Sequence, residues 1–493
     1  MKIVFVASEC VPFSKTGGLA DVAGALPEAL AALGHDVEVF IPRYRATKPG
    51  PVLPCASNLT LPLSSGFKSA SIQRGGTIKG VQHYLVDCPE LFDREGLYQT
   101  KDGKDFPDNA VRFAAFSLAA LEGLKHVSRP PEILHCHDWQ TSLVPVYLKQ
   151  LYKDDPFYRQ TSAVLTIHNL GYQGLFPAEV LPQITLSPDL FNINGLEFFG
   201  KLNLMKGGIL FSDFITTVSS KYAAEIQTAE FGYGLEGVLR SRSGKLQGIL
   251  NGADYDAWNP ATDKLIPARY TPQNLEGKQA CKRSLLLRMG VAKPIADRPV
   301  IGIVSRFATQ KGFDLIAGIA GELMQENLYI VALGTGEPQY EQLFRTLAAQ
   351  DPEKFLVKVA YDNELAHQIE AGADIFLMPS QYEPCGLNQI YSLKYGTVPV
   401  VRATGGLDDT IQEFDGARGT GFKFSDYSAP ALLDTIRKAL ATYRQPAAWA
   451  RLMQNGMSRD FSWTASAKAY AEVYEELAKP RTKTAPQTSK QMQ

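Results

Sequence analysis

The chain has 493 residues, too many for a single hydrophobic core, so we expect two large domains. Hydrophobic residues make up 45% and charged residues 20%, as in an ordinary globular protein, and a formal net charge of −1 provides no overall field for nucleic acid or an anionic membrane. The six cysteines show no Cys-x-x-Cys pairing, and no apolar run approaches the roughly 20 residues of a membrane span. We therefore expect a cytoplasmic protein in a reducing compartment, with neither nucleic acid nor membrane as a partner.

Apolar, strand-like runs alternate with helical stretches along the chain. In the first half they lie at residues 3–7, 37–41, 133–136, 163–167 and 214–218. In the second half they lie at residues 300–304, 329–333, 355–359, 375–378 and 398–401. Such alternation predicts parallel sheets covered by helices on both faces. A long stretch without a clear strand separates the two series, so we expect two doubly wound α/β domains, residues 1–258 and 259–478.

Three other segments complete the predicted organisation. Residues 45–130 are less regular and are expected to elaborate the first domain. The last helical pattern, residues 467–477, is counted with the second domain, although the sequence alone allows it to pack on either one. The polar, unpatterned residues 479–493 are expected to be disordered.

Glu383 lies between the apolar run at residues 374–378 and a helical pattern that we expect to hold Cys385 and Gly386 in its first turn. Ligands of open α/β sheets bind outside the carboxyl ends of the strands, and helix N-termini attract anions. The position therefore suits a functional carboxylate. Taken alone, an isolated Glu-Pro of this kind is more often a solvated loop residue, and only the rest of the chain reverses that preference.

The first strand is followed by Lys-Thr-Gly-Gly-Leu at residues 15–19 and then by apolar residues at helical spacing. Glycines between a strand and a helix let backbone N–H groups approach a phosphate, and Lys15 adds a positive charge. The segment matches neither of the common nucleotide-binding glycine motifs. A plain tight turn is the alternative interpretation.

Polar residues also end two later strands of the first half. We expect His135 and His137 to point to opposite faces of a strand, and no third ligand lies nearby, so a metal site is not predicted. Asp138 could bind a polar ligand or cap a helix, and Trp139 offers an apolar face of the kind that meets a sugar ring. His168 is either structural or catalytic.

Arg306 and Lys311 follow the first strand of the second half. Two cations at the ligand edge of a sheet suit a diphosphate leaving group, because they neutralise the charge that grows as the bond breaks. A solvated basic loop is the alternative.

The ordered set of motifs resembles the bacterial glycogen synthases and the plant and cyanobacterial starch synthases that use ADP-glucose, glycosyltransferase family 5. The resemblance runs from residue 1 to residue 478. Its motifs lie at residues 15–19, 135–139, 166–169, 251–252, 305–312, 383–386 and 404–407.

This resemblance implies a GT-B fold, in which two Rossmann-like domains face each other across a deep cleft. It also implies transfer of glucose from ADP-glucose to the nonreducing end of an α-1,4-glucan such as glycogen, starch or a maltooligosaccharide, with retention of configuration. The implied reaction needs no metal and no cofactor besides the nucleotide sugar.

The resemblance further implies a role for individual residues. The implied catalytic residues are Glu383, His168, Lys311 and Arg306. The implied donor-binding residues are Lys15, Gly17, Gly18, Asn251, Arg306, Lys311, Tyr361, Cys385, Gly386, Leu387, Thr404, Gly405 and Gly406. The implied acceptor-binding residues are Tyr98, Asp138 and Trp139. Many other retaining GT-B enzymes carry a second glutamate eight positions after the first, where this chain has Tyr391, and this departure favours the ADP-glucose group.

A retaining glycosidase needs two carboxyl groups about 5 Å apart. Only Glu383 is a convincing carboxylate here, which favours departure of ADP with attack by the acceptor hydroxyl from the same face. The alternatives are an α-glucan phosphorylase, for which we find no pyridoxal phosphate lysine, a UDP-glucose-dependent or sucrose synthase, and a non-catalytic glucan-binding protein on a synthase scaffold.

Overall fold

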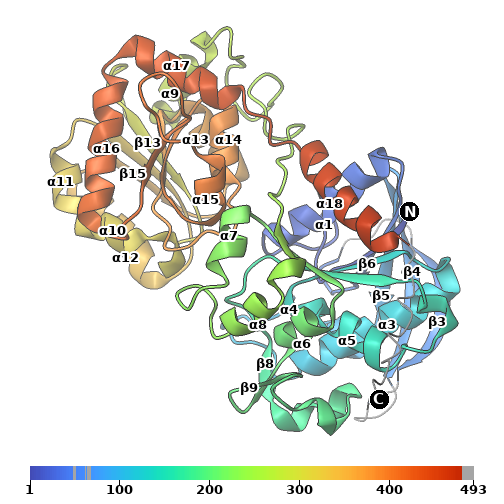
Figure 1. Cartoon of the computed structure of the whole chain (residues 1–493). Coiled ribbons are helices and arrows are strands. Elements are labelled where there is room, and N and C mark those ends of the chain that lie inside the picture. Colours follow the sequence, from blue (N-terminus) through green and yellow to red (C-terminus); the bar gives the residue numbers. More distant parts are fainter. Residues whose placement is uncertain (48–51, 62, 64–67, 480–493) are drawn as a thin grey trace, which may run out of the picture. The chain divides into compact units, whose positions relative to one another are not determined.

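The computed structural model describes residues 1–47, 52–61, 63 and 68–479. Contacts divide the chain into two compact units (Figure 1). The N-terminal unit comprises Met1–Leu165, Tyr172–Ile215 and Ala467–Gln493, and the C-terminal unit comprises Thr166–Gly171 and Thr216–Ser466. Apart from Lys479, the predicted disordered tail lies outside the described residues.

The N-terminal half is built on a nine-stranded sheet of order β12-β11-β7-β6-β1-β2-β5-β4-β3. Its strands are β1 (Lys2–Val6), β2 (Asp36–Pro42), β3 (Leu53–Leu61), β4 (Lys68–Ile78), β5 (Val81–Asp87), β6 (Ile133–His137), β7 (Ser162–Ile167), β11 (Phe214–Thr217) and β12 (Leu246–Gly248). β1 pairs in parallel with β2 and β6. The five strands predicted in this half are therefore confirmed as β1, β2, β6, β7 and β11.

The irregular region at residues 45–130 contributes three strands that the sequence did not reveal. β5 extends the sheet in parallel beside β2, and β4 and β3 continue it in antiparallel order. A tight turn of Lys79 and Gly80, both with positive φ, joins β4 to β5. β3 is largely exposed, so its sequence lacks the continuous apolar run by which the buried strands were recognised.

Helices and a small second sheet complete the N-terminal unit. The helices are α1 (Gly18–Ala32), α2 (Pro89–Phe92), α3 (Asn109–Val127), α4 (Asp138–Thr141), α5 (Leu143–Gln150), α6 (Leu204–Phe211) and α18 (Trp463–Ala478). The small sheet has the order β8 (Leu175–Pro177), β10 (Lys201–Asn203), β9 (Glu197–Phe198). Short 3-10 helices lie at η1 (Pro156–Tyr158), η2 (Ala178–Val180), η3 (Pro182–Ile184) and η4 (Pro188–Leu190).

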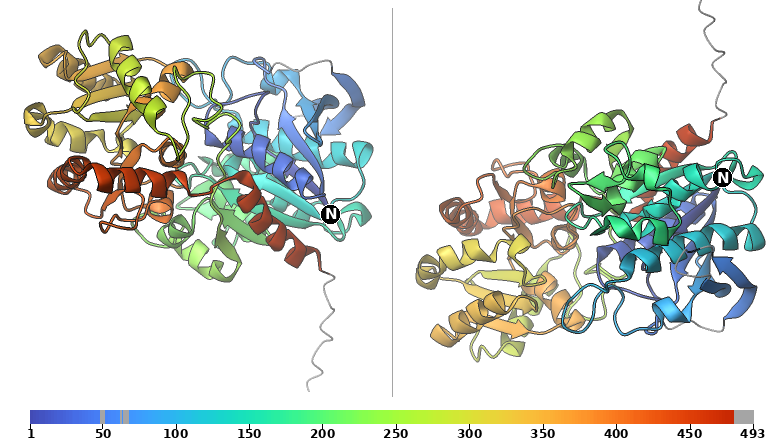
Figure 2. Two further views of the ribbon diagram at one scale, coloured as in Figure 1. Left: turned by 90° about the horizontal axis from the view of Figure 1, so that it is seen from above. Right: turned by 90° about the horizontal axis from the view of Figure 1, so that it is seen from below.

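Most of the final helix, α18, belongs to the N-terminal unit, where Figures 1 and 2 show it alongside α1. The Tyr474 hydroxyl is 2.7 Å from Nδ1 of His135 at the end of β6. The Ser162 hydroxyl of β7 donates to the carbonyl of Leu477. The grouping of residues 467–478 with the second domain thus differs from the structure, because buried aromatic contacts with β6 hold the helix.

The C-terminal unit contains a six-stranded parallel sheet of order β15-β14-β13-β16-β17-β18. Its strands are β13 (Val300–Val304), β14 (Tyr329–Gly334), β15 (Phe355–Val359), β16 (Ile375–Met378), β17 (Val398–Arg402) and β18 (Phe422–Phe424). Its helices are α7 (Ser220–Glu225), α8 (Glu236–Ser241), α9 (Glu276–Arg288), α10 (Phe313–Gly318), α11 (Ala320–Gln325), α12 (Pro338–Gln350), α13 (Asn363–Gly372), α14 (Asn388–Lys394), α15 (Gly405–Thr410), α16 (Ala429–Tyr443) and α17 (Pro446–Met457), with 3-10 turns η5 (Ser243–Lys245) and η6 (Thr309–Lys311).

Alternate residues of this sheet pack into different cores, because successive side chains of a strand point to opposite faces. Ile301 and Ile303 join a cluster with α10, α12 and α16, whereas Val300 packs with α9 and α13 on the other side (Figure 1). The predicted doubly wound α/β architecture is therefore confirmed.

The boundary predicted between residues 258 and 259 stays a prediction. The nine-stranded sheet continues through β12 to Gly248, whereas the grouping by contacts changes at Thr216. α7 accounts for the difference, because it follows β11 of that sheet but packs on α15.

Candidate active site

Three loops leave neighbouring strands at the carboxyl edge of the C-terminal sheet. Residues 305–312 follow β13, residues 379–387 follow β16, and residues 403–404 follow β17. Ligands of open parallel sheets bind at this edge. Six of the thirteen residues predicted to bind the donor lie on these three loops: Arg306, Lys311, Cys385, Gly386, Leu387 and Thr404.

Lys311 and Glu383 meet at this edge. The Lys311 ammonium is 2.6 Å from a carboxylate oxygen of Glu383, and the Ser380 hydroxyl donates to the same oxygen at 3.1 Å. Glu383 is only 6% exposed, so its carboxylate is held in one place by the ion pair. The structure thus brings together two of the four predicted catalytic residues.

The loops that carry these two residues are joined through their backbones. Gly312 has a φ of +75°, and a Cβ there would lie 1.9 Å from the carbonyl oxygen of Pro379. Gln381 donates its backbone N–H to the carbonyl of Gln310, and the Gln310 amide donates to the carbonyl of Tyr382. This close approach requires glycine at position 312.

Arg306 differs from Lys311 in its surroundings. Its side chain is exposed and makes no hydrogen bond or ion pair with the residues that the structure describes. Of the two predicted phosphate-binding cations, Lys311 is neutralised within the protein and Arg306 keeps a charge available to an anion.

The four residues from Glu383 to Gly386 form a loop rather than a helical turn. Gly386 has a φ of +69°, which an α-helix does not accommodate, so α14 begins at Asn388 and not at Cys385 as predicted. All four carbonyls accept a hydrogen bond: Glu383 from the Gly406 N–H, Pro384 from the Ser219 hydroxyl, and Cys385 and Gly386 from the Gln389 amide. Burial raises the pKa of the Cys385 thiol to about 12, so it is not a thiolate at neutral pH.

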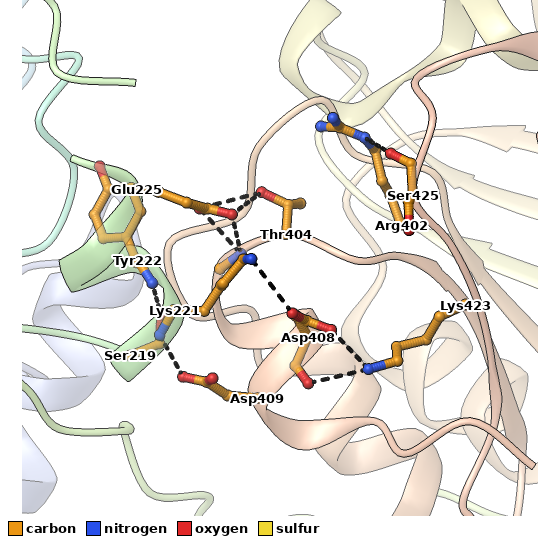
Figure 3. Close-up of polar contacts among 11 residues, drawn as sticks. Ser219, Lys221, Tyr222, Glu225, Arg402, Thr404, Asp408, Asp409, Lys423 and Ser425 are labelled. Atoms are coloured by element: carbon orange, nitrogen blue, oxygen red, sulfur yellow. Dashed lines mark hydrogen bonds and ion pairs between the residues drawn. The ribbon is translucent and has the colours of Figure 1, made fainter. Parts of the chain in front are cut away.

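Thr404 and Gly405 are held by a carboxylate that the sequence did not indicate, Glu225 on α7 (Figure 3). The Glu225 carboxylate accepts from the Thr404 hydroxyl at 3.2 Å and from the Gly405 N–H at 3.1 Å. Lys221 on the same helix donates its N–H to Asp409. α7 therefore fixes the N-terminal turn of α15 within the C-terminal unit.

Two further residues of this unit have properties that suit sugar hydroxyls. Loss of hydration lowers the pKa of His168 to about 3, so its imidazole is neutral at neutral pH. Asn251 is 7% exposed, and its side-chain oxygen has no hydrogen-bond partner among the described residues. A buried acceptor without a partner costs stability, so a ligand hydroxyl that donates to it would remove this cost. Tyr361 is 86% exposed and follows β15 at the same sheet edge, and Leu387 precedes α14.

In the N-terminal unit, Lys15 pairs with Asp21 at 2.7 Å, and Gly17 precedes the first residue of α1. A Cβ at Gly17 or Gly18 would meet nothing within 4 Å, and neither residue has a positive φ. The chain itself therefore does not require glycine at either position, and the N-terminus of α1 stays open to a ligand.

The predicted acceptor residues differ in exposure. The Tyr98 hydroxyl is 2.7 Å from that of Ser8. Asp138 has a left-handed φ of +55°, a strained geometry of the kind found at functional sites. Trp139 is only 8% exposed and packs against Phe113 and Phe176, so its ring does not present the open face that we expected.

The expected geometry of His135 and His137 is wrong. Their ring centroids are 4.3 Å apart, because residues two positions apart on a strand share a face. Within the described part of the chain, no group of three or more His, Cys, Asp or Glu residues could hold a metal ion. No helix there is long and apolar enough to cross a membrane.

Comparison with known proteins agrees with this geometry. Residues 2–241 match the family model of the starch synthase catalytic domain, and residues 291–455 match that of glycosyl transferases group 1. The chain is 56% identical to a glycogen synthase of Koribacter versatilis over 98% of this chain and 99% of that one, and 47% identical to a glycogen synthase of Moorella thermoacetica over 98% of each.

Solved structures extend the comparison. The catalytic domain of starch synthase IV from Arabidopsis thaliana, bound to ADP and acarbose, superposes with a TM-score of 0.88 at 32% identity, over 97% of this chain and 99% of that one. A sucrose-phosphate synthase from Thermosynechococcus elongatus has a TM-score of 0.62 at 19% identity over 97% and 98%, which shows a shared fold only.

Proposed function

The chain belongs to the family of glycogen and starch synthases, and from this premise we propose that it transfers glucose from ADP-glucose to the nonreducing end of an α-1,4-glucan with retention of configuration. The resemblance found in the motifs is confirmed by these relatives. The ADP and acarbose bound to the Arabidopsis enzyme support a nucleotide donor and a glucan acceptor. We further propose that the reaction uses no cofactor besides the nucleotide sugar, and that the protein acts in the cytoplasm.

The observation that carries the proposed chemistry is the ion pair between Lys311 and Glu383 at the carboxyl edge of the sheet. In the proposed mechanism Glu383 lies near the donor glucose and stabilises the positive charge that develops as the bond to ADP breaks. Arg306, whose charge is not neutralised within the protein, binds the diphosphate, and Lys311 contributes to the same phosphate site while it orients Glu383.

The chain has tyrosine where many other retaining enzymes have a second glutamate, and this supports departure of ADP with attack from the same face. Tyr391 stands where many other retaining enzymes carry glutamate, and its ring stacks on Trp258 with centroids 4.3 Å apart and planes 4° apart. The position holds no carboxylate, so we propose a reaction without a glycosyl-enzyme intermediate, and a glycosyl group trapped on Glu383 would contradict it. The leaving phosphate then accepts the proton of the attacking glucan hydroxyl.

The remaining predicted residues receive roles from their surroundings. Asn251 and neutral His168 are proposed to bind glucose hydroxyls, and exposed Tyr361 to stack on adenine. The residues proposed to complete the donor site are Lys15, Gly17, Gly18, Cys385, Gly386, Leu387, Thr404, Gly405 and Gly406. Tyr98 and Asp138 are proposed to bind the glucan, and the predicted role of Trp139 remains a prediction.

The test is release of nucleoside diphosphate from ADP-glucose and UDP-glucose side by side, with and without maltooligosaccharide. We expect release from ADP-glucose that depends on the glucan, at a rate that a chelator does not change. Preference for UDP-glucose would contradict the proposed donor and favour the UDP-glucose-dependent alternative. A folded protein that binds glucan but turns over neither donor would favour the non-catalytic alternative.

Replacing either partner of the ion pair tests the site itself. Lys311→Ala should slow turnover by roughly 10²–10³-fold, the usual loss for one transition-state contact. Glu383→Gln should abolish transfer but leave ADP binding measurable by calorimetry. Lys438→Ala is the matched control, because Lys438 is a half-exposed lysine paired with Glu413 on the same unit. Wild-type activity of Lys311→Ala would show that Lys311 does not contribute to catalysis.

A further inference from the structure

Glu9 lies beneath the Lys15–Gly18 segment, in the loop that follows β1. It is 4% exposed, whereas residues 15–18 above it are exposed. Its carboxylate accepts hydrogen bonds from the backbone N–H of Thr16 and, at 2.9 Å, from the Thr16 hydroxyl. One buried carboxylate thus holds both the backbone N–H and the side-chain hydroxyl of Thr16 at the start of an exposed glycine loop.

Burying the Glu9 carboxylate is energetically unfavourable for a contact with only a structural role. Burial is the largest influence on its carboxyl group, and it raises the pKa above the ordinary value despite the hydrogen bonds from Thr16. A raised pKa means that the ionised form is less favourable relative to the protonated form in the folded chain than in the unfolded chain. The carboxylate is therefore kept at an unfavourable buried position, where its two hydrogen bonds fix the orientation of Thr16.

We propose that Glu9 is a positioning residue that holds Thr16, and through it the Lys15–Gly18 segment, in the orientation in which this segment binds the donor. The inference rests on the proposed function. Asp21 holds the Lys15 side chain at 2.7 Å, so one carboxylate fixes the backbone of the segment and another fixes its cation. The open space at Gly17 and Gly18 leaves the orientation of these peptides to Glu9 rather than to packing.

The same construction occurs independently in the other unit. Glu225, also buried and also with a pKa raised chiefly by burial, accepts from the hydroxyl of Thr404 and the N–H of Gly405. In both places a buried carboxylate accepts from the threonine hydroxyl and from a backbone N–H of a Thr-Gly-Gly-Leu segment at the start of a helix, the N–H of Thr16 in one and of Gly405 in the other. Recurrence at two predicted donor segments supports a role in orienting them.

The experiment compares Glu9→Gln, Thr16→Val and the double variant by steady-state kinetics. A neutral amide oxygen accepts these hydrogen bonds more weakly than a carboxylate, and the NH₂ group beside it cannot accept, so Glu9→Gln should lower kcat/KM for ADP-glucose about tenfold, the lower end of the loss expected for a hydrogen bond to a charged group. The KM for glucan should stay unchanged, and the melting temperature should not be lower than that of the wild type. The double variant should lose no more than the more severe single variant, because both act through one contact.

Glu38→Gln is the matched control. Glu38 on β2 is another buried glutamate of the same unit and pairs with Lys2, so the change should lower stability but leave the KM for ADP-glucose unchanged. Wild-type kinetics of Glu9→Gln, or losses that add in the double variant, would overturn the proposal. If Glu9→Gln does not fold, the Thr16→Val variant tests the proposal by itself, because Thr16 is exposed and its replacement should not disturb folding.

Amide hydrogen exchange separates this inference from the proposed function. Exchange at Thr16 and Gly17 should be faster in Glu9→Gln than in the wild type, whichever donor the enzyme uses. Unchanged exchange would overturn the positioning role. A wild type that does not use ADP-glucose would contradict the proposed function alone.

Discussion

The tetrapeptide Thr-Gly-Gly-Leu occurs at residues 16–19, where α1 begins, and at residues 404–407, where α15 begins. At the first copy the threonine and both glycines are exposed, and a Cβ on either glycine would meet nothing. At the second copy Thr404 is 1% exposed, and a Cβ on Gly405 or Gly406 would lie 2.0 Å from the carbonyl oxygen of Glu383 or Cys385.

The difference teaches that one sequence motif can require glycine for two physical reasons. In the second copy glycine lets the backbone of α15 approach the Glu383 loop, which is a requirement of the protein's own packing. In the first copy no neighbouring atom lies within 4 Å of the place where a side chain would begin, so close approach of a bound molecule is the reason that we propose for glycine there. The two copies should therefore respond differently to the same substitution.

Gly405→Ala should have the largest effect. Gly405 has a φ of +45°, and the added methyl group would displace the Glu383 carbonyl. A shift of about 1 Å in a catalytic loop costs on the order of 10²-fold in rate. We expect at least that loss in kcat, together with a lower melting temperature. Wild-type kinetics and stability would show that the second copy is not tightly packed.

Gly17→Ala should separate binding from stability. Because the new methyl group meets no protein atom, thermal unfolding should be unchanged. If the donor approaches the backbone there, KM for ADP-glucose should rise about tenfold, the equivalent of one lost hydrogen bond. Isothermal calorimetry with ADP provides a second measurement. An unchanged KM and ADP affinity would show that the open space is not used by the donor.

The smallest effect concerns pH and the two buried carboxylates. Burial raises the pKa of both Glu9 and Glu225 above the ordinary value of 4.5, so each ionised group costs stability at neutral pH. Glu9→Gln and Glu225→Gln should therefore melt at or slightly above the wild-type temperature at pH 7. As pH falls through the folded-state pKa toward 4.5, protonation of the wild type removes this cost and the difference should shrink.

The charged and titratable neighbours of the two carboxylates set the controls for this titration. Asp21, Cys10, Tyr44 and Tyr98 act on or respond to the charge of Glu9. Lys221 and Arg402 act on Glu225. Melting curves between pH 4 and 8 measure the effect. A difference that grows as pH falls would contradict the raised pKa values.

The sequence predicted the strands that are buried on both faces, because continuous apolar runs mark them, and it predicted that Lys311 and Glu383 share a site, because both follow strands at one sheet edge. It did not reveal Glu225, which lies 179 residues before Thr404 and enters the site only through the packing of α7 on α15. Glu9 is close in sequence to Thr16. No periodic pattern, however, distinguishes a loop glutamate whose side chain is buried beneath neighbouring residues from one whose side chain is solvated. The burial of the Trp139 ring was not predicted, because Gly174 and Phe176, which lie against it, are distant in the sequence.

The packing of α18 on β6 has a consequence for how the chain is synthesised. The N-terminal unit includes residues 467–478, so more than 250 residues of the other unit, Thr216–Ser466, are made before its last helix is available. Domains fold as they emerge from the ribosome. The contact between the buried ring of His135 and the Tyr474 hydroxyl therefore cannot form until translation is nearly finished. A fragment that ends at residue 258 therefore lacks part of its own core, and separate expression of the two halves should begin from boundaries that restore this helix to the first.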